Sequence, residues 1–151
     1  MIRKGDKVPD MELRTDQGTP LSLADLSGRA VVVFLLGRLF TPTGERVLKL
    51  LSDTADRFLS LEFSPVAISG EPVKELAKYN KQNKLPFLLA SDGSRRLHEK
   101  LRGDDGGGIS VWIISSEGYV IDTVPKLPPT ELINVVLERI SRFRKGHEVR
   151  N

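Results

Sequence analysis

The sequence predicts an α/β protein in which a central mixed sheet is covered by helices on both faces. Three observations support this class. Apolar runs of strand length alternate with amphipathic stretches of helical length through most of the chain. The first residues have the pattern of a β-hairpin, and a clearer hairpin pattern at 111–124 precedes the last amphipathic stretch. Alternating strands and helices that close with a hairpin favour a sheet with both parallel and antiparallel strands.

The expected order of elements is β-β-β-α-β-α-β-α-β-β-α, with a short helical turn at 23–28 after the first hairpin. The strands are expected at 11–15, 19–23, 31–36, 61–69, 87–90, 111–115 and 119–124. The helices are expected at 45–59, 72–79, 94–101 and from 129 to about 143. Because Val31–Leu36 is apolar throughout, it is typical of a strand buried on both faces. We expect it to neighbour the strands at 61–69 and 111–115.

The helix after Val31–Leu36 has a recognisable start. Thr41 is a good N-cap residue, and Pro42 suits the first helical position, where a missing N–H costs nothing. Gly44 then falls in the first turn. Because glycine is tolerated better at a helix end than in its interior, we expect the helix to form despite it.

Length and composition limit the classes of protein. The 151 residues predict one domain spanning 1–151. With 39% hydrophobic and 28% charged residues, the chain is typical of soluble globular proteins rather than disordered ones. No apolar run approaches the roughly 20 residues that span a bilayer, so no membrane association is expected. The first residues lack the apolar core of a secretory signal, and a cytoplasmic location is therefore expected.

The net charge of +3 is concentrated in a basic C-terminal tail from about residue 144 and in the helical turns before it. The cations there are Arg139, Arg142, Arg144, Lys145 and Arg150. They could form a patch for nucleic acid or another anionic surface. The alternative is a solvated helix end whose cations complement the helix dipole. The second interpretation is favoured because no aromatic stacking motif accompanies the basic residues, so nucleic acid is an unlikely partner.

No metal or cofactor is expected. The two histidines, His98 and His147, are far apart and have no ligand spacing with carboxylates. The chain also has no phosphate-binding or dinucleotide-binding glycine motif. It contains no cysteine, which excludes disulfides, thiolate metal ligands and thiol nucleophiles.

Several short strings resemble the peroxiredoxin branch of the thioredoxin fold, the AhpC/TSA and redoxin group. They are Gly5-Asp6-Lys7-Val8-Pro9-Asp10, Leu21-Ser22-Leu23-Ala24-Asp25-Leu26-Ser27-Gly28 before Val31-Val32-Val33-Phe34, Thr41-Pro42, Leu85-Pro86-Phe87-Leu88-Leu89-Ala90-Ser91-Asp92, and Trp112-Ile113-Ile114 with Glu117-Gly118. The resemblance covers about residues 5–140. It implies a thioredoxin-like three-layer α/β/α sandwich with a central mixed sheet and an N-terminal β-hairpin.

The resemblance also implies where an active site would lie. The family motif reads Pro-x-x-x-Thr-x-x-Cys, and Thr41 matches its threonine. Gly37 stands at the proline position and Gly44 at the position of the peroxidatic cysteine. The family's arginine falls at or near Ile109, and no arginine occurs between residues 103 and 124. A peroxide must be attacked by a thiolate, so no catalytic residue is assigned here.

The resemblance with a vacated active site predicts a catalytically degenerate peroxiredoxin-like protein that acts by binding or self-association. Members of the family pair through edge strands or around the active-site turn, which implies a homodimer. One alternative is a redox-linked role through a partner thiol protein. Another is a small-anion pocket formed by Thr41, Pro42, Thr43 and Gly44, because a helix N-terminus binds anions and the missing cysteine side chain should leave space.

Overall fold

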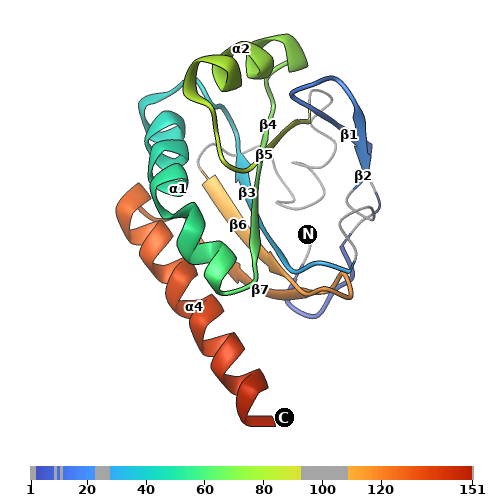
Figure 1. Cartoon of the computed structure of the whole chain (residues 1–151), viewed down its shortest axis with the longest axis vertical. Coiled ribbons are helices and arrows are strands. Elements are labelled where there is room, and N and C mark those ends of the chain that lie inside the picture. Colours follow the sequence, from blue (N-terminus) through green and yellow to red (C-terminus); the bar gives the residue numbers. More distant parts are fainter. Residues whose placement is uncertain (1–2, 9, 11, 23–27, 93–108, 151) are drawn as a thin grey trace.

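The structure, a computed structural model, describes residues 3–8, 10, 12–22, 28–92 and 109–150 (Figure 1). Its strands are β1 (Glu12–Thr15), β2 (Pro20–Ser22), β3 (Val31–Leu36), β4 (Ser64–Ser69), β5 (Leu88–Ser91), β6 (Ile109–Ile114) and β7 (Val120–Val124). Its helices are α1 (Pro42–Ser60), α2 (Val73–Asn83) and α4 (Pro129–Arg150). The predicted helix at 94–101 and almost all of the predicted turn at 23–28 lie outside the described residues.

The strands form one mixed sheet in the order β2-β1-β5-β4-β3-β6-β7. β3 pairs parallel to β4, and β4 pairs parallel to β5, whereas the other pairings are antiparallel. The prediction that the strands around 31–36, 61–69 and 111–115 are neighbours is confirmed. The predicted N-terminal hairpin is also present, with Leu13 opposite Leu21.

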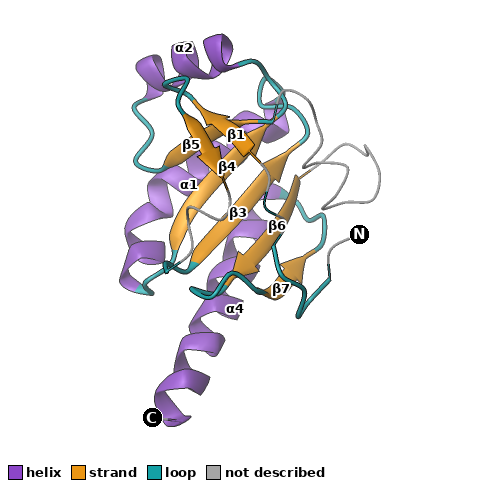
Figure 2. Ribbon diagram, turned by 90° about the vertical axis from the view of Figure 1, so that its right-hand side faces the viewer, coloured by secondary structure: helices purple, strands orange, loops and turns teal. Residues whose placement is uncertain are grey.

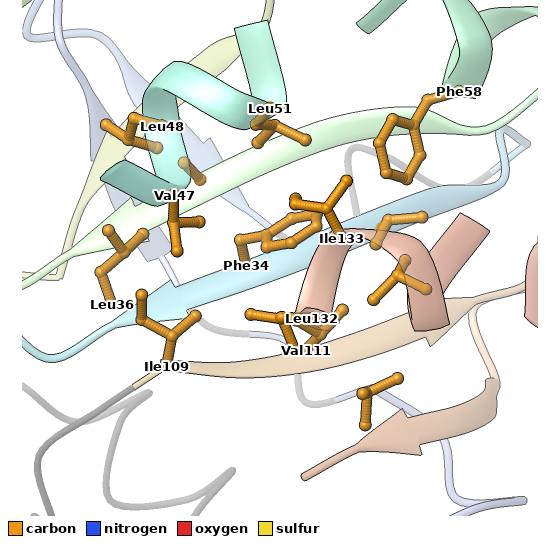
Figure 3. Close-up of a cluster of buried hydrophobic side chains, with 14 of the residues drawn as sticks. Phe34, Leu36, Val47, Leu48, Leu51, Phe58, Ile109, Val111, Leu132 and Ile133 are labelled. Atoms are coloured by element: carbon orange, nitrogen blue, oxygen red, sulfur yellow. The ribbon is translucent and has the colours of Figure 1, made fainter. Parts of the chain in front are cut away.

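α1 and α4 lie behind the sheet in Figure 2, and together with α2 they contribute to the larger hydrophobic core on one face of the sheet. Figure 3 shows its centre, where Phe34 of β3 points toward side chains of α1 and α4. Phe34 meets Phe58 of α1 edge to face, with ring centroids 6.1 Å apart. The other face holds a second cluster that includes Val33, Leu35 and Trp112. β3 is therefore buried on both faces, as its apolar sequence predicts.

The turn after α1 shortens the predicted strand at 61–69. The N–H of Phe63 donates to the carbonyl oxygen of Phe58 at 3.1 Å, and Glu62 adopts a positive φ of 64°. This left-handed residue reverses the chain, so β4 begins only at Ser64. The sequence pattern does not reveal this turn. Leu61 and Phe63 are as apolar as the residues of the strand that follows, so the strand was expected to begin at Leu61.

The basic segment from residue 144 continues α4, whose C-terminal part projects away from the sheet (Figure 1). Up to residue 146, beyond which the side chains of this helix are not described, the last fully buried side chain is that of Ile140. Phe143 is half-buried and meets Phe63 edge to face, at 6.1 Å between ring centroids. Within the described ranges, no helix is both long enough and apolar enough to cross a membrane.

Candidate functional site at the start of α1

The four family-equivalent positions meet at one edge of the sheet. Gly37 directly follows β3 and is buried. Ile109 begins β6 and pairs in register with Leu36, next to Gly37. Thr41 and Gly44 lie at the start of α1, which follows β3 after a short loop. The carboxyl ends of β3, β4 and β5 also lie at this edge, where open α/β sheets commonly bind ligands.

Thr41 caps α1, as predicted. Its backbone is extended, with φ −136° and ψ 157°, and its Oγ1 accepts a hydrogen bond from the N–H of Gly44 at 3.0 Å. The N–H of Glu45 donates to the carbonyl oxygen of Thr41 at 3.0 Å. Pro42, the first helical residue, has no N–H to satisfy. The cap therefore uses donors that a bound anion would otherwise need.

The expectation of empty space at Gly44 is wrong. A Cβ atom built on Gly44 would lie 2.5 Å from the carbonyl oxygen of Arg38 and 2.5 Å from that of Leu39. The carbonyl carbon of Leu39 would be 3.0 Å away. These neighbours are main-chain atoms, which cannot rotate aside as a side chain can. The backbone of 38–39 therefore occupies the position that the Cβ of a cysteine would need.

Glu71, which the sequence analysis did not single out, holds the segment 38–40 in this position. The N–H of Leu39 donates to both carboxylate oxygens, at 3.0 Å to Oε1 and 2.9 Å to Oε2. The N–H of Phe40 donates to Oε2 at 3.3 Å. The hydroxyl of Ser69 donates to Oε1 as well. Glu71 follows β4 by two residues, and a carboxylate at the carboxyl end of a buried parallel strand was the only sequence signal for it.

The carboxylate of Glu71 is favoured in its ionised form. Burial raises the pKa of Glu71. Its carboxylate accepts hydrogen bonds from the Ser69 hydroxyl and from the backbone N–H groups of Leu39, Phe40 and Glu71 itself. Together these hydrogen bonds outweigh burial, so the pKa lies below its ordinary value of 4.5. The segment 38–40 is thus bound to an anion that belongs to the protein.

Two side chains of the segment 38–40 add further attachments. Leu39 is fully buried in the larger core. Phe40 is 48% exposed, and its ring meets that of Tyr79 on α2 edge to face at 5.8 Å between centroids. Burial raises the pKa of the Tyr79 hydroxyl, and the charge of Glu45 raises it further. The loop is therefore fixed to α2 and β4 as well as to α1.

The position assigned to the family's arginine is apolar core. Ile109 is 6% exposed and belongs to the same hydrophobic cluster as Leu36 and Val47. Figure 3 shows the side chains of Leu36 and Ile109 at the same end of the core. A guanidinium at this position would be buried beside aliphatic groups.

The chain has no thiol nucleophile, and three of the backbone N–H groups at this site are already hydrogen-bonded within the protein. The N–H groups of Leu39 and Phe40 donate to Glu71, and that of Gly44 donates to Thr41. Among the residues that the structure describes, no three carboxylate or histidine side chains gather in a way that could hold a metal ion.

Comparison with known proteins agrees with the resemblance seen in the sequence. Peroxiredoxin Bcp of Bacillus subtilis is 29% identical over 130 residues, which cover 80% of this chain and 83% of that protein. The crystal structure of peroxidoxin BcpB from Mycobacterium tuberculosis superposes with a TM-score of 0.84 at 24% identity, over 94% of this chain and 98% of that chain. Peroxiredoxin Q of Xanthomonas campestris gives a TM-score of 0.79 at 19% identity, over 89% and 91% of the two chains.

The two structural likenesses establish the thioredoxin-like fold of peroxiredoxins. The family itself is established by sequence, because the model of the AhpC/TSA family matches residues 4–123, well over half of the chain. The protein is a member of the AhpC/TSA family.

Proposed function

We propose that the chain is a catalytically degenerate peroxiredoxin-like protein that lacks thiol peroxidase activity and acts by binding or self-association. The observation that carries this proposal is the contact at Gly44. The chain has no cysteine, and carbonyl oxygens of Arg38 and Leu39 would lie 2.5 Å from a Cβ at this position. The site has therefore lost both its nucleophile and the room for one.

The chemistry of peroxide reduction supports the first half of the proposal. Only a thiolate gives a strong nucleophile at neutral pH without an adjacent general base. Stabilisation of the leaving oxygen needs donors aimed at the reacting atoms. Here the donors of Leu39 and Phe40 are bound to Glu71 instead.

The edges of the sheet bear on how copies of the chain would associate. The outer edge of β7 is partly covered, because Val120 exchanges backbone hydrogen bonds of 2.8 Å with Gly5 and Asp6. Arg139 also donates to the carbonyl oxygen of Thr123 at 2.8 Å. β2, at the other edge, has only three residues. Covered or short edge strands resist pairing with another chain. Self-association is therefore better supported at the surface around Phe40.

The small-anion alternative has less support than binding of a protein partner. A helix N-terminus attracts anions through its free N–H groups. In α1 the first residue is proline, and the N–H of Gly44 is used by the Thr41 cap. The nearby donors of Leu39 and Phe40 already hold the carboxylate of Glu71.

Two measurements test the proposed function. Consumption of hydrogen peroxide with dithiothreitol or thioredoxin as reductant is expected to stay at the buffer rate, with Bacillus subtilis peroxiredoxin Bcp as the comparison protein. Heat-sensitive turnover above that rate would refute the loss of activity. Light scattering over a range of concentrations gives the solution mass, and Phe40→Ala is expected to shift any dimer toward monomer.

A further inference from the structure

The end of α1 and the middle of α4 enclose an open groove of about 740 Å³, which we call the basic groove. One wall includes Arg57 and Leu61, and the other includes Leu137, Arg142 and Lys145. The two helices lie side by side (Figure 1), and residues from both of them line the groove. α1 has 19 residues and is therefore about 28 Å long, which places the groove at the opposite end from the Thr41 cap.

The groove has a net positive charge, because Arg57, Arg142 and Lys145 line it together with a single acidic residue, Glu138. Arg142 is paired with Glu138, four residues earlier on the same helix. Across the part of the chain that the structure describes, no ion pair is recorded for Arg57 or Lys145, and both are exposed. These two cations therefore face solvent from opposite sides of the groove and can attract an anionic ligand.

The groove also has apolar surface. Leu61, which is half-buried, supplies accessible apolar surface, whereas Leu137 also lines the groove but is only 4% exposed. No aromatic side chain is among the residues that line it. Stacking on aromatic rings is the usual means by which proteins hold single-stranded nucleic acid, so this lining does not favour such a ligand. Cations beside aliphatic side chains fit a ligand that carries both carboxylates and aliphatic groups.

We propose that the basic groove binds an acidic peptide segment of a partner protein, with carboxylates at Arg57 and Lys145 and an aliphatic side chain over Leu61. Sites for small molecules bury most of their ligand in a closed cavity. This groove is open and lies between two helices, an arrangement that suits a segment of polypeptide. The inference rests on the binding part of the proposed function and names its partner class.

The test uses the full chain and a fluorescein-labelled peptide of three Glu-Leu-Glu-Glu repeats. Binding is measured by fluorescence anisotropy, with a peptide of Gln-Leu-Gln-Gln repeats as the neutral probe. The groove variant is Arg57→Glu with Lys145→Glu. The matched control is Lys74→Glu with Lys78→Glu, two exposed positions on α2. Both double variants change the net charge from +3 to −1.

The groove variant is expected to weaken binding of the acidic peptide at least tenfold, whereas the control variant changes it less than twofold. The Gln-containing peptide should bind at least tenfold more weakly than the acidic one. Thermal unfolding confirms that both variants fold. Equal losses in the two variants would show attraction by net charge alone, and no loss in either would place binding elsewhere. Either result overturns the proposal.

Other occupants are tested in competition. The competitors are duplex DNA and vesicles of phosphatidylserine and phosphatidylcholine, each added at the same total anionic charge as the peptide. Displacement of the peptide by either competitor would indicate a general polyanion surface and overturn the proposal. A dimer in solution that is dissociated by the groove variant would assign the groove to a second copy of the chain. Peroxidase assays on the unaltered chain remain separate, so failure here leaves the loss of activity untouched.

Discussion

The carboxylate of Glu71 accepts two hydrogen bonds from the backbone N–H of Leu39, at 2.9 and 3.0 Å, across 32 positions of the sequence. This contact joins the end of β4 to the loop between β3 and α1. It holds the carbonyl groups of Arg38 and Leu39 against Gly44. The acidic side chain and the glycine thus act together in keeping the backbone of 38–39 close to the start of α1.

Glu71→Gln is expected to destabilise the fold by about 1 kcal/mol at pH 7, because hydrogen bonds to a charged acceptor are stronger than those to an amide. The pKa of Glu71 is lowered in the folded state, so its contribution is fully present above the ordinary value of 4.5 and is lost as pH falls through the folded pKa. Urea unfolding at pH 7, 5, 4 and 3 should show the difference between the two proteins shrinking in acid.

The control for this pH series is Asp56→Asn, which removes an exposed carboxylate on α1 far from the loop. It should leave the free energy of unfolding within about 0.5 kcal/mol of the original. A difference for Glu71→Gln that stays constant from pH 7 to 3 would mean that its ionisation is not coupled to folding.

Gly44→Ala is expected to destabilise the protein by about 1–3 kcal/mol, because the new methyl group meets two carbonyl oxygens and the loop must move. Helix propensity alone would instead predict a gain in stability, since alanine is more favourable than glycine by about 1 kcal/mol in a helix interior. Chemical unfolding of the purified variant decides between the two. A gain in stability would show that the loop does not press on Gly44.

Gly146→Ala is the matched substitution in α4, where a Cβ atom would have no heavy atom within 4 Å. With space available, the propensity effect should dominate and raise the stability by up to about 1 kcal/mol, less where the helix end frays. Opposite signs at the two glycines would separate the effect of close contact from that of conformational entropy.

Thr41→Ala should cost about 1 kcal/mol, because the N–H of Gly44 loses the Oγ1 acceptor that lies 3.0 Å away. Thr41→Ser keeps the hydroxyl and should retain most of this stability. The two variants are compared by thermal and urea unfolding. If serine were as damaging as alanine, the methyl group of Thr41 rather than its hydroxyl would be the stabilising part.

Ile109→Arg, the residue type that the resemblance implies at or near this position, should cost more than about 3 kcal/mol, because the charge would be buried in an aliphatic cluster. Ile109→Val at the same position should cost about 0.5–1.5 kcal/mol. Circular dichroism with urea unfolding measures both. A folded and stable arginine variant would mean that this side chain can reach solvent from the start of β6.

The fold could be predicted where hydrophobic pattern and capping chemistry are local. The apolar run Val31–Leu36 forms a buried strand, as predicted. The Thr41-Pro42 pair begins α1, also as predicted. Boundaries in polar sequence were less certain. α2 runs to Asn83 rather than to Tyr79, because its last turn has no apolar residue that marks the helical period. It ends at Lys84, which adopts a positive φ of 48°.

The site was harder to predict because its contacts are not local. Glu71 lies 32 positions from Leu39, and nothing in either neighbourhood indicates the hydrogen bonds between them. We expected space at Gly44 on the assumption that the loop between β3 and α1 keeps the same path whether position 44 is a cysteine or a glycine. Instead the backbone lies where that side chain would be. The basic groove joins residues that are far apart in the sequence, such as Arg57 and Lys145, which are separated by 88 positions.

The closeness of the Arg38 and Leu39 carbonyl groups to Gly44 has a consequence for how such a protein can change over generations. A cysteine arriving at this position would meet main chain already in place, so it would weaken the fold before it offered any reactivity. Making room for such a side chain would first require loosening the contacts of Glu71, a step that brings no reactivity by itself. A path of single substitutions to a thiol at this position would therefore pass through less stable variants before any reactivity could be selected.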